Sequence, residues 1–317
     1  MVAEWKLFRT APTVTRVAAI DCGTNSIRLL IADIDGDGFR EITRTMEIVR
    51  LGQGVDKNKA FHPEALERTL KATEQFSYEI ARRGVQQIRF CATSATRDAS
   101  NRDLFIDGVK AILGVEPEVI SGEEEARLSF MGATKELRGE GAPYLVIDIG
   151  GGSTEFVYGT TDVEFAKSQN IGCVRMSERH LSTIPPDPVD IERAIADIDE
   201  AILGAATSVP ITKASTLIAV AGTATTVAAA ALNLNSYDRY SIHLARIAAS
   251  RAHEISRQFL KMTRDEIAAL PFMHPGRVDV IAAGSLVLSR ILIHSQAKEF
   301  VASESDILDG MAWSLAK

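Results

Sequence analysis

Apolar and polar residues along this chain follow a strand pattern twice, and each strand ends in an aspartate before a glycine turn. The first run is Val17 to Ile20, followed by Asp21; the second is Leu145 to Ile147, followed by Asp148 and three glycines at 150–152. After each turn the pattern is again that of a strand. Because glycine at such a turn lets backbone N–H groups approach a ligand closely, we predict two similar half-molecules facing one phosphate-bearing ligand.

The remaining periodicities place further elements in the same order in both halves. Strand patterns cover residues 17–21, 27–33, 39–49, 87–93, 118–120, 144–148, 155–158, 163–168, 216–220 and 299–302. Helical patterns cover residues 62–83, 101–113, 123–135, 188–203, 243–262, 264–270, 278–294 and 305–315. A hairpin turn is predicted at 35–38, and loops of small or hydroxyl side chains at 94–98 and 221–226. The order βββαβα therefore occurs twice.

Composition narrows the class of protein. A length of 317 residues with 46% apolar and 24% charged residues is typical of a soluble protein with two domains. A net charge of −7 argues against binding to duplex nucleic acid. No apolar run is long enough to span a membrane, and residues 1–15 lack the features of a signal peptide, so we expect a short leader and no membrane partner. The three cysteines are scattered, which indicates buried thiols in a reducing, cytoplasmic compartment.

The glycine-containing segments differ in how specifically they indicate a site. The first turn, taken alone, is equally typical of a plain hairpin. The second is more specific, because three consecutive glycines weaken a strand and are expected to serve no packing purpose. The third segment, Ala221 to Thr226, is equally consistent with the N-terminus of a helix capped by threonine.

Five segments together resemble the exopolyphosphatase/guanosine pentaphosphate phosphatase family. They are Asp21 to Ser26, Ala92 to Ala99, Ser121 to Ala126, Asp148 to Glu155 and Gly222 to Thr226. The resemblance implies an α/β fold of the actin, Hsp70 and sugar-kinase superfamily, with two ribonuclease-H-like lobes, mixed five-stranded sheets and an interlobe cleft. We expect residues 1–126 plus 303–317 to form one lobe and residues 127–302 the other, with the last helix returning to the first lobe.

The resemblance also assigns roles to two charged residues. Glu125 matches the position of the catalytic base and would orient and deprotonate a water molecule. A solvated helix start is the alternative interpretation of the run Glu123 to Glu125, and Glu124 is the neighbour most easily confused with Glu125. Arg97 is expected to contact phosphate, since a guanidinium group fits phosphate oxygens; a surface arginine is the alternative.

By the same resemblance, Asp148 and Glu155 are predicted ligands of Mg²⁺, with Asp21 contributing from the other lobe. Hard carboxylate oxygens suit this cation. Phosphate oxygens are expected to contact residues of the three loops, namely Gly23, Thr24, Asn25, Ser26, Gly150, Gly151, Gly152, Ser153, Thr154, Gly222 and Thr223. Arg175 and Arg277 fit two roles equally well, guiding a longer anionic chain or pairing with acids of the other lobe.

These assignments predict a Mg²⁺-dependent exopolyphosphatase that releases orthophosphate from the end of inorganic polyphosphate. Guanosine pentaphosphate 5′-phosphohydrolase activity would use the same site, and a kinase or ATPase of the same superfamily is a further alternative. A non-catalytic sensor of alarmone or polyphosphate is the alternative from another class. The chain has no Walker-type phosphate loop, and its glycine turns lead into strands, which disfavours a dinucleotide-binding site. We expect a homodimer.

Overall fold

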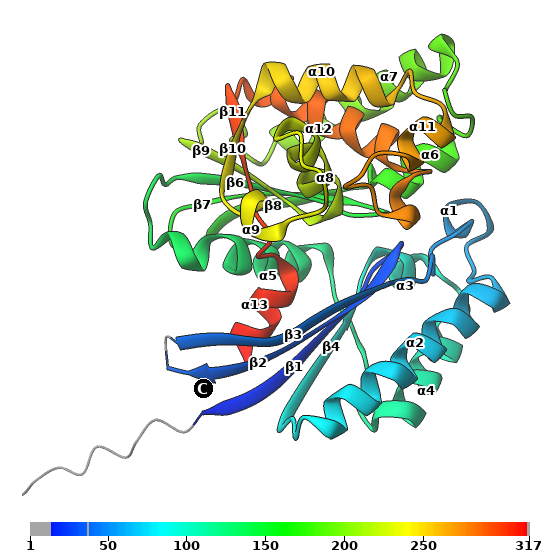
Figure 1. The fold of residues 1–317 in the computed structure, drawn as a ribbon, viewed down its shortest axis with the longest axis vertical. Coiled ribbons are helices and arrows are strands. Elements are labelled where there is room, and N and C mark those ends of the chain that lie inside the picture. Colours follow the sequence, from blue (N-terminus) through cyan, green and yellow to red (C-terminus); the bar gives the residue numbers. More distant parts are fainter. Residues whose placement is uncertain (1–13, 37, 316–317) are drawn as a thin grey trace, which may run out of the picture.

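The computed structural model describes residues 14–36 and 38–315, and it contains two mixed sheets that lie one above the other in Figure 1. In the first sheet the strand order is β3-β2-β1-β4-β5. Its strands are β1 (Thr15–Cys22), β2 (Ser26–Asp35), β3 (Gly38–Ile48), β4 (Gln87–Ala92) and β5 (Glu118–Val119). Strand β1 runs antiparallel to β2 and parallel to β4. Most of the predicted leader, and Asp37 of the predicted hairpin turn, lie outside the described residues.

The second sheet repeats this arrangement and adds a strand, in the order β10-β11-β9-β6-β7-β8. Strand β6 runs antiparallel to β7 and parallel to β9, just as β1 does to β2 and β4. The strands are β6 (Tyr144–Ile149), β7 (Thr154–Gly159), β8 (Val163–Gln169), β9 (Thr216–Val220), β10 (Ala245–Ala248) and β11 (Glu299–Ala302). The predicted pair of ribonuclease-H-like sheets is confirmed, but five strands is wrong for the second sheet, which has six.

The additional strand, β10, lies where the periodicity predicts a helix from residue 243. Ile247 is buried and pairs with Phe300 of β11, whereas the exposed Ala248 pairs with Glu299. Four residues rich in alanine carry little strand signal of their own, so pairing with the neighbouring strand decides their conformation. The helix begins only at residue 249.

Helices cover both faces of each sheet. Helices α2 and α4 pack on one face of the first sheet, and α5 and α13 lie between the two sheets (Figure 1). Helices α7, α8, α10 and α12 cover the other face of the second sheet. The longer helices are α2 (Pro63–Arg82), α4 (Arg102–Leu113), α5 (Gly122–Thr134), α7 (Pro188–Ala206), α8 (Ala221–Ala231), α10 (Ala249–Phe259), α12 (Ile281–Ser295) and α13 (Ile307–Ser314). The shorter ones are α1 (Val55–Asn58), α3 (Ser94–Asp98), α6 (Cys173–Arg179), α9 (Arg239–Ile242) and α11 (Arg264–Ala268).

Over residues 14–36 and 38–315, no helix is both long and apolar enough to cross a membrane.

Two segments predicted as loops are helical. Helix α3 occupies 94–98, and α8 begins at residue 221 inside the predicted loop; α6 corresponds to no predicted element. These stretches are too short, or too uniformly small, for a helical period to show. Tertiary contacts fix them instead: the Ser94 hydroxyl at the start of α3, for example, lies 3.0 Å from the Thr24 hydroxyl.

Helices α5 and α13 join the two halves of the molecule. Leu308 and Met311 of α13 pack with strands β1 and β2, so the last helix lies on the first sheet. The predicted boundary between residues 126 and 127 falls within α5, which contacts both sheets. That division stays a prediction. Below, the first lobe means the first sheet with its helices, and the second lobe means the second sheet with its helices.

The crossing of α5 and α13 depends on glycine. A Cβ atom on Gly310 would lie 2.0 Å from the Leu128 carbonyl oxygen, a backbone atom that has no room to move. We therefore expect Gly310→Ala to lower the free energy of unfolding by about 3 kcal/mol, measured by urea titration. The control is Gly204→Ala, because its Cβ would meet only the end of the Gln169 side chain, at 3.2 Å. Equal stability of both variants would contradict this packing.

Candidate active site

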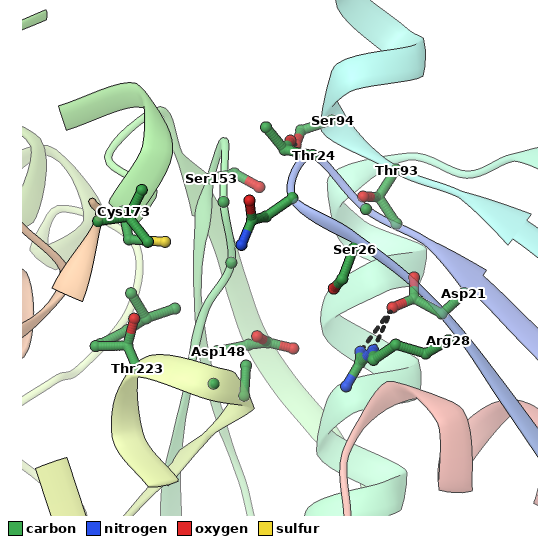
Figure 2. Close-up of a pocket in the computed structure, with 18 of the residues that line it drawn as sticks. Asp21, Thr24, Ser26, Arg28, Thr93, Ser94, Asp148, Ser153, Cys173 and Thr223 are labelled. Carbon is green, nitrogen blue, oxygen red and sulfur yellow. Dashed lines mark hydrogen bonds and ion pairs between the residues drawn. The ribbon is translucent and has the colours of Figure 1, made fainter. Parts of the chain in front are cut away.

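A cavity of about 100 Å³ lies between the two lobes, where their glycine-containing loops face each other (Figure 2). Most of the predicted site residues line it: Asp21, Gly23, Thr24, Asn25, Ser26, Glu125, Asp148, Gly150, Gly151, Ser153, Gly222 and Thr223. Four predicted residues do not line it: Arg97, Gly152, Thr154 and Glu155. Residues far apart in the sequence thus meet at one small cavity.

The first loop joins β1 to β2. The carbonyl oxygen of Thr24 accepts a hydrogen bond from the Gly52 amide at 2.8 Å, and that of Asn25 accepts from Arg50 at 2.9 Å. The segment after β3 thus holds the loop carbonyls. Within the described part of the chain, the N–H groups of Thr24 and Asn25 have no hydrogen-bond partner. Both residues line the cavity, so these donors are available to an anion.

The second loop, residues 150–153, joins β6 to β7 and is held by the start of α6. The carbonyl oxygens of Gly150 and Gly151 accept from the amides of Cys173 and Val174, both at 2.9 Å, and that of Gly152 accepts from Gly172 at 3.3 Å. The C=O of one residue and the N–H of the next point in opposite directions across a trans peptide. The N–H groups of residues 151–153 therefore point away from α6, and none has a partner among the described residues.

The glycines of this loop do serve packing, contrary to the expectation from the sequence. A Cβ atom on Gly151 would lie 2.8 Å from Thr24 Cβ and 3.2 Å from the Asn25 amide nitrogen. One on Gly152 would lie 2.6 Å from the Ser94 hydroxyl. All three contacted residues belong to the first lobe, so these glycines let the two loops approach each other closely.

The third segment is the N-terminus of α8, one of the two interpretations that the sequence leaves open. Ala221 has φ of 65°, and no side chain in the described part of the chain caps the helix, which has 11 residues. Gly222 and Thr223, in its first turn, line the cavity. The unpaired N–H groups and the positive end of the helix dipole favour an anion there.

Carboxylates gather at and beside the cavity, since Asp21, Glu125 and Asp148 line it and Glu155 does not. Asp21, Glu125, Asp148 and Glu155 are all buried. Burial raises the pKa of Glu125 to about 7 and that of Asp148 to about 6; Arg97 opposes the first shift, and Asp306 adds to the second. Burial and the negative charges of Glu125 and Asp148 likewise raise the pKa of Glu155. Four negatively charged carboxylates in one buried site repel one another, so the arrangement is unfavourable unless protons or a cation neutralise them.

These carboxylates fit a Mg²⁺ site that is completed by phosphate. Two buried carboxylate oxygens, Asp21 Oδ1 and Glu155 Oε2, have no hydrogen-bond partner among residues 14–36 and 38–315. Yet in the part of the chain that the structure describes, no three acidic, histidine or cysteine side chains lie close enough together to hold a metal ion. Mg²⁺ is commonly held by one or two carboxylates together with water and substrate phosphates, so a site completed by phosphate agrees with both observations.

Glu125 and Arg97 form an ion pair beside the cavity. Arg97 Nη1 donates to Glu125 Oε2 at 2.8 Å and to the Ile120 carbonyl oxygen, also at 2.8 Å. Arg97 thus holds the carboxylate that faces the cavity and does not line the cavity itself. Glu124, the neighbour most easily confused with Glu125 in the sequence, pairs with Arg89 and Arg127 at the surface.

Sequence reasoning missed several residues of the cavity wall. Arg28 lies on β2 and donates to Asp21 at 2.6 Å (Figure 2). It also pairs with Asp306, which precedes α13. A charged residue inside the apolar run 27–34, two positions after Ser26, was the available signal, because alternate residues of a strand share a face. The others are Met46, Ile48, Thr93, Ser94, Ile149, Cys173, Ala221, Val280, Ile281 and Ile307. Arg277 also lines the cavity, and Arg175 does not.

Comparison with known proteins identifies the family of this chain. The sequence profile of the Ppx/GppA phosphatase family matches residues 30–317. The chain is 43% identical to exopolyphosphatase 2 of Mycobacterium tuberculosis, over 96% of this chain and 99% of the relative. Its fold is similar to the crystal structure of an exopolyphosphatase-like protein (TM-score 0.92, 46% identity, 95% of this chain and 98% of the other). It is also similar to the Aquifex aeolicus PPX-GPPA enzyme (TM-score 0.80, 27% identity, 95% and 100%). The chain is an enzyme that belongs to the Ppx/GppA phosphatase family.

Proposed function

We propose that this protein is a Mg²⁺-dependent exopolyphosphatase, which hydrolyses the terminal phosphoanhydride bond of inorganic polyphosphate. The observation that carries the proposal is the small cavity of about 100 Å³, which is lined by Glu125, by the N-terminus of α8 and by two loops whose backbone N–H groups have no partner among the described residues. A space of this size suits one phosphoryl group. The relative that is 43% identical is named exopolyphosphatase 2.

Three groups of residues would have different roles in phosphoryl transfer. N–H groups of the first loop, the second loop and the N-terminus of α8 would hold the terminal phosphate oxygens and stabilise the charge that spreads over them. Glu125, held in place by Arg97, would orient a water molecule in line with the scissile bond and accept its proton. One or two carboxylates of the set Asp148, Glu155 and Asp21 would hold Mg²⁺ together with water and substrate oxygens, and the cation would neutralise phosphate charge.

An adjoining cavity supports guanosine pentaphosphate as the second candidate substrate. Its volume is about 300 Å³, and it shares Arg28, Met46, Ala221, Gly222 and Arg277 with the first cavity. Arg44, Arg239 and the ring of Tyr237 complete much of its wall. Arginines would suit the further phosphates of either substrate, whereas an aromatic ring would favour a base.

The test is orthophosphate release with and without Mg²⁺ from tripolyphosphate, long-chain polyphosphate, guanosine pentaphosphate and ATP. The proposal expects Mg²⁺-dependent release from both polyphosphates. Release from guanosine pentaphosphate alone would support the assigned site but would show that the substrate is guanosine pentaphosphate and not polyphosphate. Release from ATP alone would favour the ATPase alternative, and ligand binding without release would favour a sensor.

The activity should depend on pH through Glu125. Its pKa of about 7 means that the carboxyl loses its proton, and gains the ability to act as a base, as the pH rises through neutrality. We expect kcat/KM to rise with pH up to about 7 and then to level off. In Arg97→Met the rise should shift to higher pH, because the lost guanidinium opposes the burial effect. A rise centred near the ordinary glutamate value of about 4.3 would contradict this role.

A further inference from the structure

A buried arginine outside the cavity contacts the second loop and the first lobe at once. Arg175 on α6 is 7% exposed. Its Nε donates to the Gly152 carbonyl oxygen at 2.7 Å, and its Nη2 donates to Asp98 at 2.6 Å. Its Nη1 pairs with Asp56 of α1. The guanidinium thus has acceptors on three separate elements.

The contact with Gly152 bears on the geometry of the second loop. The carbonyl of Gly152 and the N–H of Ser153 belong to one planar peptide group. Holding the carbonyl toward Arg175 therefore fixes the N–H of Ser153 on the opposite side of that peptide. Ser153 lines the cavity, and its N–H has no partner among the described residues.

The contact with Asp98 bears on the other side of the cavity. Asp98 ends α3, a helix of five residues. The same helix carries Ser94, which lies against Thr24 of the first loop, and Arg97, which bonds Glu125. Movement of α3 would therefore displace both the first loop and the partner of the proposed base.

We propose that Arg175 is a positioning residue, which holds the Gly152–Ser153 peptide and helix α3 in their active arrangement while the lobes are closed. The inference rests on the proposed function of the cavity, and it resolves the two roles left open by the sequence in favour of interlobe pairing. A contact between Glu178, also on α6, and the Gly54 amide at 3.1 Å lies beside it and joins the same elements.

Arginine suits this position better than lysine would. Its planar fork presents several donors in fixed directions, whereas an ammonium group is a single point charge on a flexible stem. Lysine could keep the charge near Asp56 and Asp98 but could not hold all three acceptors in their present directions. Arg175→Lys should therefore recover only part of what Arg175→Met loses.

The experiment compares Arg175→Met and Arg175→Lys with the control Arg290→Met. Arg290 is a matched choice because it also pairs with an aspartate, Asp199, at 2.6 Å, and lies outside the cavity wall. Three quantities are measured for each variant: kcat and KM for tripolyphosphate, the free energy of unfolding, and amide hydrogen exchange in segments 94–98 and 150–155. Amide exchange reports how readily both segments open, without any ligand.

We expect kcat/KM of Arg175→Met to fall by about 100-fold, mostly in kcat, because displaced groups no longer meet the transition state. Exchange in both segments should be faster than in wild type. Arg290→Met should stay within about twofold of wild type in kcat/KM, even where its stability falls. Kinetics and exchange of Arg175→Met that match the control would overturn the proposal. If wild type releases no phosphate, the proposed function fails, and exchange still decides whether Arg175 holds the two segments.

Discussion

Glu125→Gln should lower kcat for phosphate release by about 10³-fold while leaving tripolyphosphate binding nearly unchanged. The amide keeps the shape of the side chain but cannot accept a proton at neutral pH. Glu125 faces the cavity from the first turn of α5, and its carboxylate is bonded to Arg97. The loss should therefore appear in the chemical step, which is measured as phosphate release at saturating substrate.

The neighbouring glutamate provides the control for this variant. Glu124→Gln makes the same chemical change one residue away, but Glu124 pairs with Arg89 and Arg127 outside the cavity. Its kcat should stay within about twofold of wild type. If Glu124→Gln lost as much activity as Glu125→Gln, or if Glu125→Gln kept most of its activity, the assignment of the base would be wrong.

Gly151→Ala should lower kcat/KM by about 100-fold without a comparable loss of stability. The added methyl group would lie 2.8 Å from Thr24 Cβ, on the other side of the cleft. The protein can relieve this clash by opening the lobes, which leaves each lobe folded but separates the two loops. Phosphate-release kinetics and urea unfolding, measured on the same preparation, distinguish the two effects.

Gly172 serves as the comparison, because we expect its replacement by alanine to lower stability. A Cβ atom on Gly172 would lie 2.4 Å from the Gly151 carbonyl oxygen, a backbone atom of the same lobe. Opening the lobes cannot relieve that clash, so Gly172→Ala should lose stability as well as activity. If Gly151→Ala unfolds as easily as Gly172→Ala, the contact between the loops is not the relevant constraint.

The sequence alone predicted the two loops of the cavity and the order of most strands. The aspartate and glycine turns after two apolar runs indicated both hairpin loops, and the structure brings Asp21 and Asp148 to one cavity. The duplicated strand order followed from the same alternation. The resemblance selected Glu125 rather than Glu124, and in the structure only Glu125 lines the cavity, because neighbouring helical residues differ in direction by the rotation of the helix.

The remaining features depend on contacts between distant segments. Strand β10 exists because β11 offers it an edge, and the packing role of Gly151 and Gly152 requires the opposite lobe to be in place. The pairing of Arg175 with Asp56 and Asp98 joins residues 119 and 77 positions apart. No periodicity or local motif encodes such pairs.

The measurement that tests the central claim most directly is hydrolysis of tripolyphosphate by wild type with Mg²⁺ in water enriched in ¹⁸O, stopped early in the reaction. If the cavity holds the terminal phosphoryl group and Glu125 directs water at it, the P–O bond forms at the terminal phosphorus and the shortened chain leaves with the bridging oxygen. Each released orthophosphate should then carry one ¹⁸O atom, and the pyrophosphate product none. Label in the pyrophosphate, with unlabelled orthophosphate, would contradict the account.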